Sequence, residues 1–200
     1  MEEKTSRLSS WKQTRIYSCG PACLMTALNE YGESELSEKR EMELWRKVRH
    51  LFFLGSTPAY LAECAAGLGL SARLMTRNPP GPEKIPGRTL VNRLLHRYLL
   101  GVYGRTAGAY RKKGRAAAAY RKEAEILRLL EAGQNAKAIF LIADQDEIFH
   151  FILVRRVGAE LWVMDPAYGA NTPFSEGGFL AAYGPSFLGY CVLLTKTILL

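Results

Sequence analysis

The hydrophobic positions follow two patterns, one in each half of the chain. In the first half, apolar residues recur every three or four positions, which predicts amphipathic helices over 19–31, 37–51, 58–67, 88–102 and 115–132, with a short strand at 71–76. In the second half, short apolar runs alternate with turn residues, which predicts strands over 138–143, 148–155, 161–164 and 187–195, a loop over 168–173 and a helix over 174–183. The two patterns together predict an α+β fold in which an N-terminal helical half packs on a C-terminal antiparallel sheet.

One cysteine lies where an irregular segment meets the first predicted helix. Cys19 is followed by Gly20 and Pro21, and proline suits a first helical turn because its missing N–H is not needed there. We therefore expect Cys19 at the N-terminus of a buried helix, where the helix dipole favours an anion such as a reactive thiolate. The amide of Gln13, six positions upstream, can donate to an oxyanion beside such a thiol. The ordinary alternative is a buried structural cysteine on an amphipathic helix.

A histidine and an aspartate fall on neighbouring strands of the predicted sheet. His150 lies inside the strand over 148–155, and Asp165 follows the strand over 161–164 directly. Because a tight hairpin at Gly158 makes these strands neighbours, we expect the two side chains to lie side by side. A carboxylate that accepts a hydrogen bond from one imidazole nitrogen leaves the other nitrogen to meet a thiol. Taken singly, His150 can be an ordinary core histidine and Asp165 part of an ordinary Asp-Pro turn.

These positions together resemble a known family. The order of Gln13, Cys19-Gly20, His150-Phe151-Ile152 and Asp165-Pro166-Ala167-Tyr168-Gly169 is similar to that of papain-like cysteine peptidases. Within them, the chain most resembles the bacteriocin-processing peptidases, which cut leader peptides after a double glycine. The resemblance covers most of the chain in order but is specific only around the cysteine and in the His-to-Asp block.

The resemblance implies a papain-like fold formed by a single domain over 1–200. It also implies a cysteine peptidase that acts on a peptide or protein substrate through an acyl-thioester. The implied catalytic residues are Cys19, His150, Asp165 and Gln13, and we assign substrate contacts to Gly20, Phe149 and Phe151 beside them. No cofactor is implied, and the four cysteines show no metal-ligand spacing, so we expect them to be reduced, with no metal site.

Composition agrees with a catalytic domain of this size. Of the 200 residues, 48% are hydrophobic, which is enough for a sizeable core. The polar first residues do not form a secretory leader, and no apolar run reaches the roughly 18 residues that a membrane span requires, so we expect a cytoplasmic protein without a membrane segment.

The segment over 78–128 has no counterpart that we can place in the resemblance. It begins with a Pro/Gly-rich stretch over 78–87 and continues into basic helical sequence that carries most of the net charge of +8. We treat it as an insertion whose role is open, either a solvated basic surface or a site for an acidic partner. Nucleic acid is an unfavoured partner because no aromatic-basic motif or helix-turn-helix spacing accompanies the charge.

Two alternatives to peptide hydrolysis remain open. The same thioester can pass to an amine, which would make the protein an acyl or peptidyl transferase. The domain can also be a non-catalytic module that grips a leader peptide, although such modules usually lack the cysteine that this chain retains.

Overall fold

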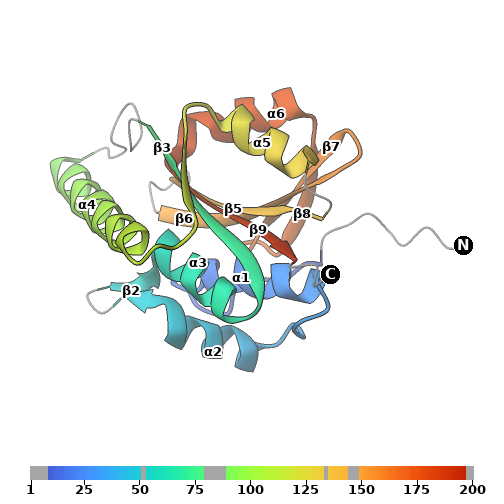
Figure 1. The fold of residues 1–200 in the computed structure, drawn as a ribbon, viewed down its shortest axis with the longest axis horizontal. Helices are drawn as coiled ribbons and strands as arrows, with labels where there is room; N and C mark the ends of the chain where they lie inside the picture. The colour runs from blue at the N-terminus through green and yellow to red at the C-terminus, as the bar shows by residue number, and fades with distance from the viewer. Residues whose placement is uncertain (1–8, 51–52, 79–88, 133–134, 144–148, 197–200) are drawn as a thin grey trace, which may run out of the picture.

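The computed structural model describes residues 9–50, 53–78, 89–132, 135–143 and 149–196. Its centre is a seven-stranded sheet with the order β4-β3-β9-β5-β6-β7-β8 (Figure 1). Neighbouring strands are antiparallel except β3 and β4, which are parallel. The strands are β3 (Leu70–Arg77), β4 (Ala117–Tyr120), β5 (Lys137–Ala143), β6 (Phe149–Val157), β7 (Glu160–Asp165), β8 (Ala170–Phe174) and β9 (Phe187–Lys196). A separate antiparallel pair joins β1 (Arg49–His50) to β2 (Phe53–Ser56).

The helices cover both faces of this sheet. They are α1 (Cys19–Glu30), α2 (Glu38–Val48), α3 (Pro58–Gly67), α4 (Leu90–Lys112), α5 (Glu123–Ala132) and α6 (Glu176–Tyr183), and a 3-10 turn follows at Gly184–Ser186. Helices α1, α2 and α3 share one hydrophobic core with one face of the sheet, and α5 and α6 share a second core with the other face. Figure 1 shows these two layers and places α4 at the side of the molecule. The arrangement confirms the predicted α+β class.

Local sequence explains where several helices begin. The Ser37 hydroxyl accepts a hydrogen bond from the backbone N–H of Arg40 at the start of α2, and the Thr57 hydroxyl accepts one from the N–H of Tyr60 at the start of α3. Each side chain satisfies an N–H group that has no partner within its helix. Pro58 occupies the first turn of α3, as its position in the sequence predicted.

The structure corrects four boundaries. Residues 115–120 were expected to be helical, but Ala117–Tyr120 forms β4, which pairs with β3. The expected loop at 168–173 contains most of β8. The helix expected over 37–51 ends at Val48, and the chain continues into the strands β1 and β2 instead. The helix expected to end near residue 102 continues as α4 to Lys112. The predicted break over 78–87 lies almost wholly outside the described residues.

Candidate active site

Helix α1 places Cys19 at its first position. The side chains from Cys19 to Leu28 are all buried, so the helix runs through the core beneath β6. Its first intrahelical hydrogen bond runs from the N–H of Ala22 to the carbonyl of Ser18, and Pro21 has no N–H. The N–H groups of Cys19 and Gly20 therefore lie at the positive end of the helix dipole, without a partner inside the helix.

His150 and Asp165 meet on adjacent strands. His150 lies on β6, and Asp165 is the last residue of β7, the strand that pairs with β6. The Nε2 atom of His150 is 2.8 Å from Oδ1 of Asp165, and the same oxygen accepts the N–H of Ala167 at 2.9 Å. Because Asp165 occupies Nε2, only Nδ1 of the ring remains to face another group.

That other group is the thiol of Cys19. Burial lowers the pKa of His150, but side-chain hydrogen bonds with Asp165 and with Cys19 outweigh it and raise this pKa from 6.5 to about 10. Cys19 and His150 are each 7% exposed, so little water competes for their contact. The His150 ring thus lies between the Cys19 thiol and the Asp165 carboxylate and is hydrogen-bonded to the carboxylate, a constellation able to stabilise a thiolate–imidazolium pair.

The turn after β7 is held against the N-terminal segment. The N–H of Gln13 donates to the carbonyl of Pro166 at 2.8 Å, and the Ser10 hydroxyl donates to the carbonyl of Gly169. Gly169 has φ +66°, and a Cβ atom there would lie 2.9 Å from Cβ of Lys12. Only glycine accommodates both this backbone conformation and this close approach. The turn that carries Asp165 is therefore tied to the segment that leads into α1.

Gln13 lies beside this turn, but its amide has a local partner. Its Nε2 donates to the carbonyl of Arg15 at 2.9 Å, while its Oε1 is buried with no hydrogen-bond partner. One N–H of the amide is thus used within the loop and one remains. The contacts of Gln13 place it next to Pro166, and its role as an oxyanion donor stays a prediction.

A buried carboxylate that the sequence analysis did not assign holds the segment before Cys19. Glu41 on α2 is 0% exposed and accepts hydrogen bonds from Nε1 of Trp11 at 2.8 Å, from the N–H of Thr14 at 3.0 Å and from the hydroxyl of Ser18. Its position was readable, because residue 41 lies on the same helical face as Leu44. A charged residue on the apolar face of a helix signals a buried polar contact.

The three residues assigned to substrate contact lie at different depths. A Cβ atom on Gly20 would lie 3.1–3.2 Å from Leu61, Phe151 and Ser56, so Gly20 serves close packing between α1, α3 and the sheet. Phe151 is 2% exposed and belongs to the core, which leaves its side chain no surface for a substrate. Phe149 is half-buried, and its substrate contact stays a prediction.

The other cysteines are reduced and lie apart from this chemistry. Cys23 and Cys191 are fully buried, and burial raises the pKa of both thiols. Cys64 is partly exposed, and burial also raises the pKa of its thiol although Lys47 lowers it. Cys64 lines a surface cavity of about 290 Å³, which contains none of Cys19, His150 and Asp165. Within the described ranges, no group of three His, Cys, Asp or Glu side chains could hold a metal ion.

A membrane-spanning segment would require a long and apolar helix. In the part of the chain that the structure describes, no helix combines the length and apolar character needed to cross a bilayer.

Comparisons with known proteins place the fold. Residues 9–82 match the model of the Peptidase_C39 like family. The solved peptidase domain of Streptococcus ComA, described as a bi-functional ABC transporter involved in a quorum-sensing pathway, is similar in structure, with a TM-score of 0.51 and 17% sequence identity. The similarity covers 95% of this chain and 99% of that domain. None of the curated proteins compared matches the chain. The fold is that of a papain-like C39 peptidase domain, and the resemblance to this group of cysteine peptidases is confirmed.

Proposed function

We propose that the protein is a cysteine peptidase that hydrolyses peptide bonds through Cys19, His150 and Asp165. The observation that carries the proposal is the His150 ring, which faces the Cys19 thiol at the N-terminus of α1 and is hydrogen-bonded to Asp165 on its other side. A structural cysteine needs neither a histidine partner nor a carboxylate behind that histidine. The C39-like family match over residues 9–82, the segment that contains Cys19, supports the same chemistry.

The first half of the reaction forms an acyl-enzyme. Nδ1 of His150 takes the thiol proton, and the Cys19 thiolate attacks the carbonyl carbon of the substrate to form a tetrahedral intermediate. The backbone N–H of Cys19 and the remaining N–H of the Gln13 amide donate hydrogen bonds to the oxyanion; removing one such donor typically costs about 10²-fold or more in kcat. The imidazolium then protonates the leaving amine as the C–N bond breaks, leaving a thioester on Cys19.

The second half releases the acid. His150 removes a proton from a water molecule, the hydroxide attacks the thioester, and the Cys19 thiolate leaves and is reprotonated through the same ring. Asp165 keeps the ring in the tautomer with Nε2–H throughout and offsets its positive charge. The substrate is a peptide chain whose acyl side ends at the bond that Cys19 attacks. The double-glycine leaders cut by the bacteriocin-processing peptidases are the first peptides to test.

The test uses a peptide that carries a thiol-reactive group at its C-terminus, read by mass spectrometry of the intact protein and its fragments. Wild-type protein should gain one label on Cys19, Cys19→Ala should gain none, and His150→Ala should react much more slowly. Cys64→Ser is the matched control, because Cys64 is the other thiol with surface exposure, and this variant should label like wild type. A label that persists in Cys19→Ala would remove Cys19 from the role of nucleophile.

The labelled site can then be tested for turnover. Incubation with double-glycine peptides should give two fragments, one with a free carboxylate, and Cys19→Ala should give none. A product whose new terminus carries an added amine would instead assign acyl transfer to the same thioester.

A further inference from the structure

The first turns of α4 expose an unusual set of side chains. Leu90, Val91, Leu94, Leu95 and Tyr98 are 52–73% exposed, whereas the other exposed large hydrophobics of the described residues, Ile16 and Tyr168, lie singly elsewhere. Single exposed hydrophobics are ordinary, but a contiguous apolar surface on one element marks an interaction site. We call these five residues the α4 outer face.

The outer face is additional to the surface that packs α4 on the protein. At about 100° per residue, positions 90–98 of the outer face fall within an arc of about 140° around the helix. His96 and Tyr103 fall on the opposite side, are 4% and 3% exposed, and contact Phe149 with ring centroids 4.6 and 5.8 Å away. A surface helix normally pairs one apolar face with one polar face. Here both sides are apolar and only one is covered.

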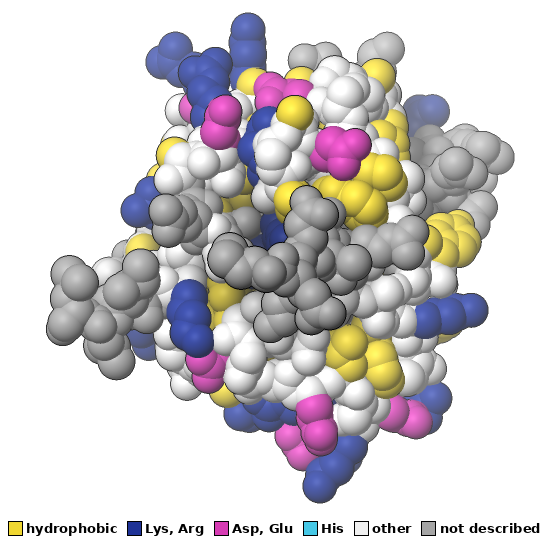
Figure 2. All heavy atoms as spheres, turned by 90° about the vertical axis from the view of Figure 1, so that its right-hand side faces the viewer, with side chains coloured by type: hydrophobic (Ala, Val, Ile, Leu, Met, Phe, Trp, Pro, Cys, Tyr) yellow, Lys and Arg dark blue, Asp and Glu magenta, His cyan; other side chains and the backbone are white. Residues whose placement is uncertain are grey.

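The charges that α4 itself carries have a single sign. Arg93 and Arg97 border it, and between residues 89 and 122 the sequence contains no Asp or Glu. Figure 2 shows a different face of the molecule, where Asp and Glu side chains lie among Lys and Arg. Two copies of the outer face placed together would bring like charges into contact, which disfavours a dimer through this surface. The complementary partner is apolar and acidic.

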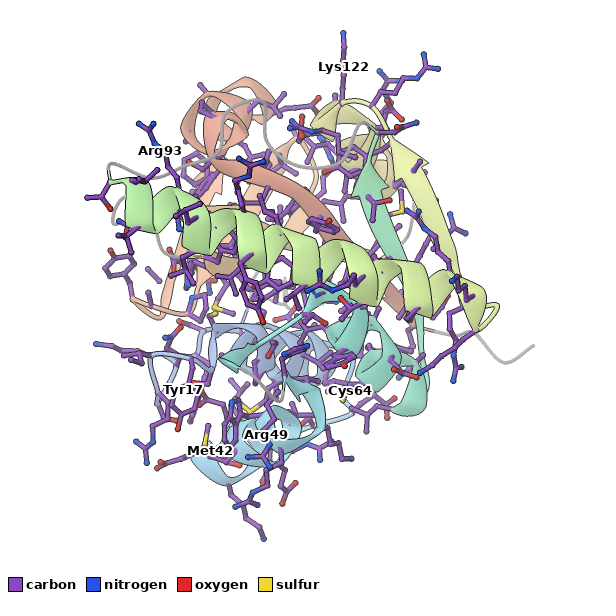
Figure 3. All side chains as sticks on the ribbon, turned by 90° about the vertical axis from the view of Figure 1, so that its left-hand side faces the viewer. Tyr17, Met42, Arg49, Cys64, Arg93 and Lys122 are labelled. Carbon is purple, nitrogen blue, oxygen red and sulfur yellow. The ribbon has the colours of Figure 1, made fainter. Side chains whose placement is uncertain are left out.

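The shape of the surface selects among such partners. Figure 3 shows α4 crossing the whole of one side of the molecule, with Arg93 extending away from the body, and Figure 1 shows α4 at the margin of the fold. Amphipathic peptides bind in grooves between elements. Tyr98, at the end of the outer face, lines a cavity of about 310 Å³ beside His50 and Arg105, whereas the four aliphatic side chains before it are exposed on α4 itself. A helix with apolar residues bordered by arginines suits the surface of an anionic bilayer, where the apolar side chains enter the acyl boundary and the guanidinium groups meet lipid phosphates.

From these observations we propose that the α4 outer face docks the protein on the surface of an anionic lipid bilayer. The helix lies in the plane of the interface and does not cross it. The proposal is independent of the peptidase chemistry, since it uses none of the proposed catalytic residues.

Vesicle co-sedimentation tests it on the full chain. We expect binding to vesicles that contain phosphatidylglycerol, weak binding to phosphatidylcholine alone, and weaker binding as salt is raised. Leu94→Asp should reduce binding to the anionic vesicles by about tenfold or more, because it removes an inserting side chain and adds a repelled charge. Leu94→Asn removes the apolar side chain without the charge and should give a smaller but clear loss. Ile16→Asp is the matched control, since Ile16 is also exposed but lies outside α4, and its binding should stay within about twofold of wild type.

Several outcomes would overturn the proposal. Absence of binding to anionic vesicles would do so, as would an equal loss for Ile16→Asp and Leu94→Asp, which would indicate attraction by net charge alone. A wild-type dimer that Leu94→Asp dissociates in light scattering would assign the outer face to a second copy of the chain. Preferential binding of an acidic amphipathic peptide over vesicles would assign it to a peptide. Thermal unfolding of each variant should match wild type, because the substituted side chains are exposed.

Discussion

Replacing Glu41 by alanine should destabilise the protein far more than an ordinary loss of a surface charge. The carboxylate is fully buried and accepts hydrogen bonds from Trp11, Thr14 and Ser18. The variant leaves the donors of Trp11 and Thr14 without their acceptor, whereas the Ser18 hydroxyl still has the carbonyl of Arg15 at 2.8 Å. A buried donor left unpaired costs about 1–3 kcal/mol. Trp11 and Thr14 are half-buried and can turn partly to water, so each should incur only part of that cost.

The expected loss in the free energy of unfolding is therefore about 2 kcal/mol, the low end of the sum for two unpaired donors, because both are half-buried. Denaturant unfolding followed by tryptophan fluorescence measures it directly. Glu38→Ala is the matched control on the same helix: its ion pair with Arg15, at 3.2 Å, is about half exposed on both sides and should contribute less than about 1 kcal/mol. If the two variants lost stability equally, the carboxylate of Glu41 would not hold the segment in the way the structure indicates.

The same variant should also slow the labelling of Cys19. Ser18 directly precedes Cys19, and Thr14 follows Gln13, so the Glu41 contacts fix the backbone on both sides of the proposed oxyanion donors. Glu41→Gln keeps the shape of the side chain and one acceptor oxygen, and should recover part of both the stability and the labelling rate. A loss of stability with an unchanged labelling rate at low temperature, where the variant is still folded, would separate Glu41 from the site and leave it a purely structural role.

Two further outcomes follow from the geometry. Gly20→Ala should lose about 1–3 kcal/mol of unfolding free energy, because its Cβ would meet three side chains at 3.1–3.2 Å. Gly108→Ala is the control: its Cβ would meet nothing within 4 Å, so this variant should be neutral or stabilising. Equal effects of the two substitutions in denaturant unfolding would contradict the packing argument. The pKa of His150, raised by its hydrogen bonds from 6.5 to about 10 in the folded state, should contribute stability that is fully present below pH 6.5 and is lost as pH rises through about 10. The unfolding free energy of wild type should accordingly fall between pH 7 and 10 relative to that of Asp165→Asn, and a constant difference across this range would contradict it.

The strands around the proposed catalytic histidine could be predicted because their signal is local. Residues 138–143 form a continuous apolar run, and β5 is buried along its whole length. The hairpin of β6 and β7 turns at Gly158, which has φ +57°, as the glycine in the sequence indicated. The contact between His150 and Asp165 followed from that hairpin, since both residues lie on paired strands.

The boundaries that were wrong depend on partners distant in the sequence. The alanines of β4 favour a helix by propensity, yet Ala117 pairs with Leu74 of β3, and this tertiary pairing decides the conformation. Pro173 made residues 168–173 look like a loop, but β8 is the last strand of the sheet, and an edge strand tolerates proline. The predicted helix ended at residue 102, but buried side chains on either side of this point, such as His96 and Tyr103, maintain α4 as far as Lys112.

The contact between Cys19 and His150 depends on how α1 lies along β6, and this relation spans most of the chain. Cys19 at the start of the helix meets His150 near the start of the strand, and Glu30 at the end of the helix pairs with Arg155 at 2.5 Å. Between these two points, Sγ of Cys23 lies 3.4 Å from the carbonyl of Phe151.

The spacing of these contacts matches the geometry of the two elements. From Cys19 to Glu30 the helix rises about 16.5 Å at 1.5 Å per residue, and from His150 to Arg155 the strand rises about the same distance at 3.3 Å per residue. Because the two rises agree, the end contacts can form together without strain, and each sets the register of the other. The position of the thiol against the imidazole is therefore fixed by the packing of a whole helix on a whole strand, and the ion pair at the far end of α1 contributes to the geometry of the proposed active site.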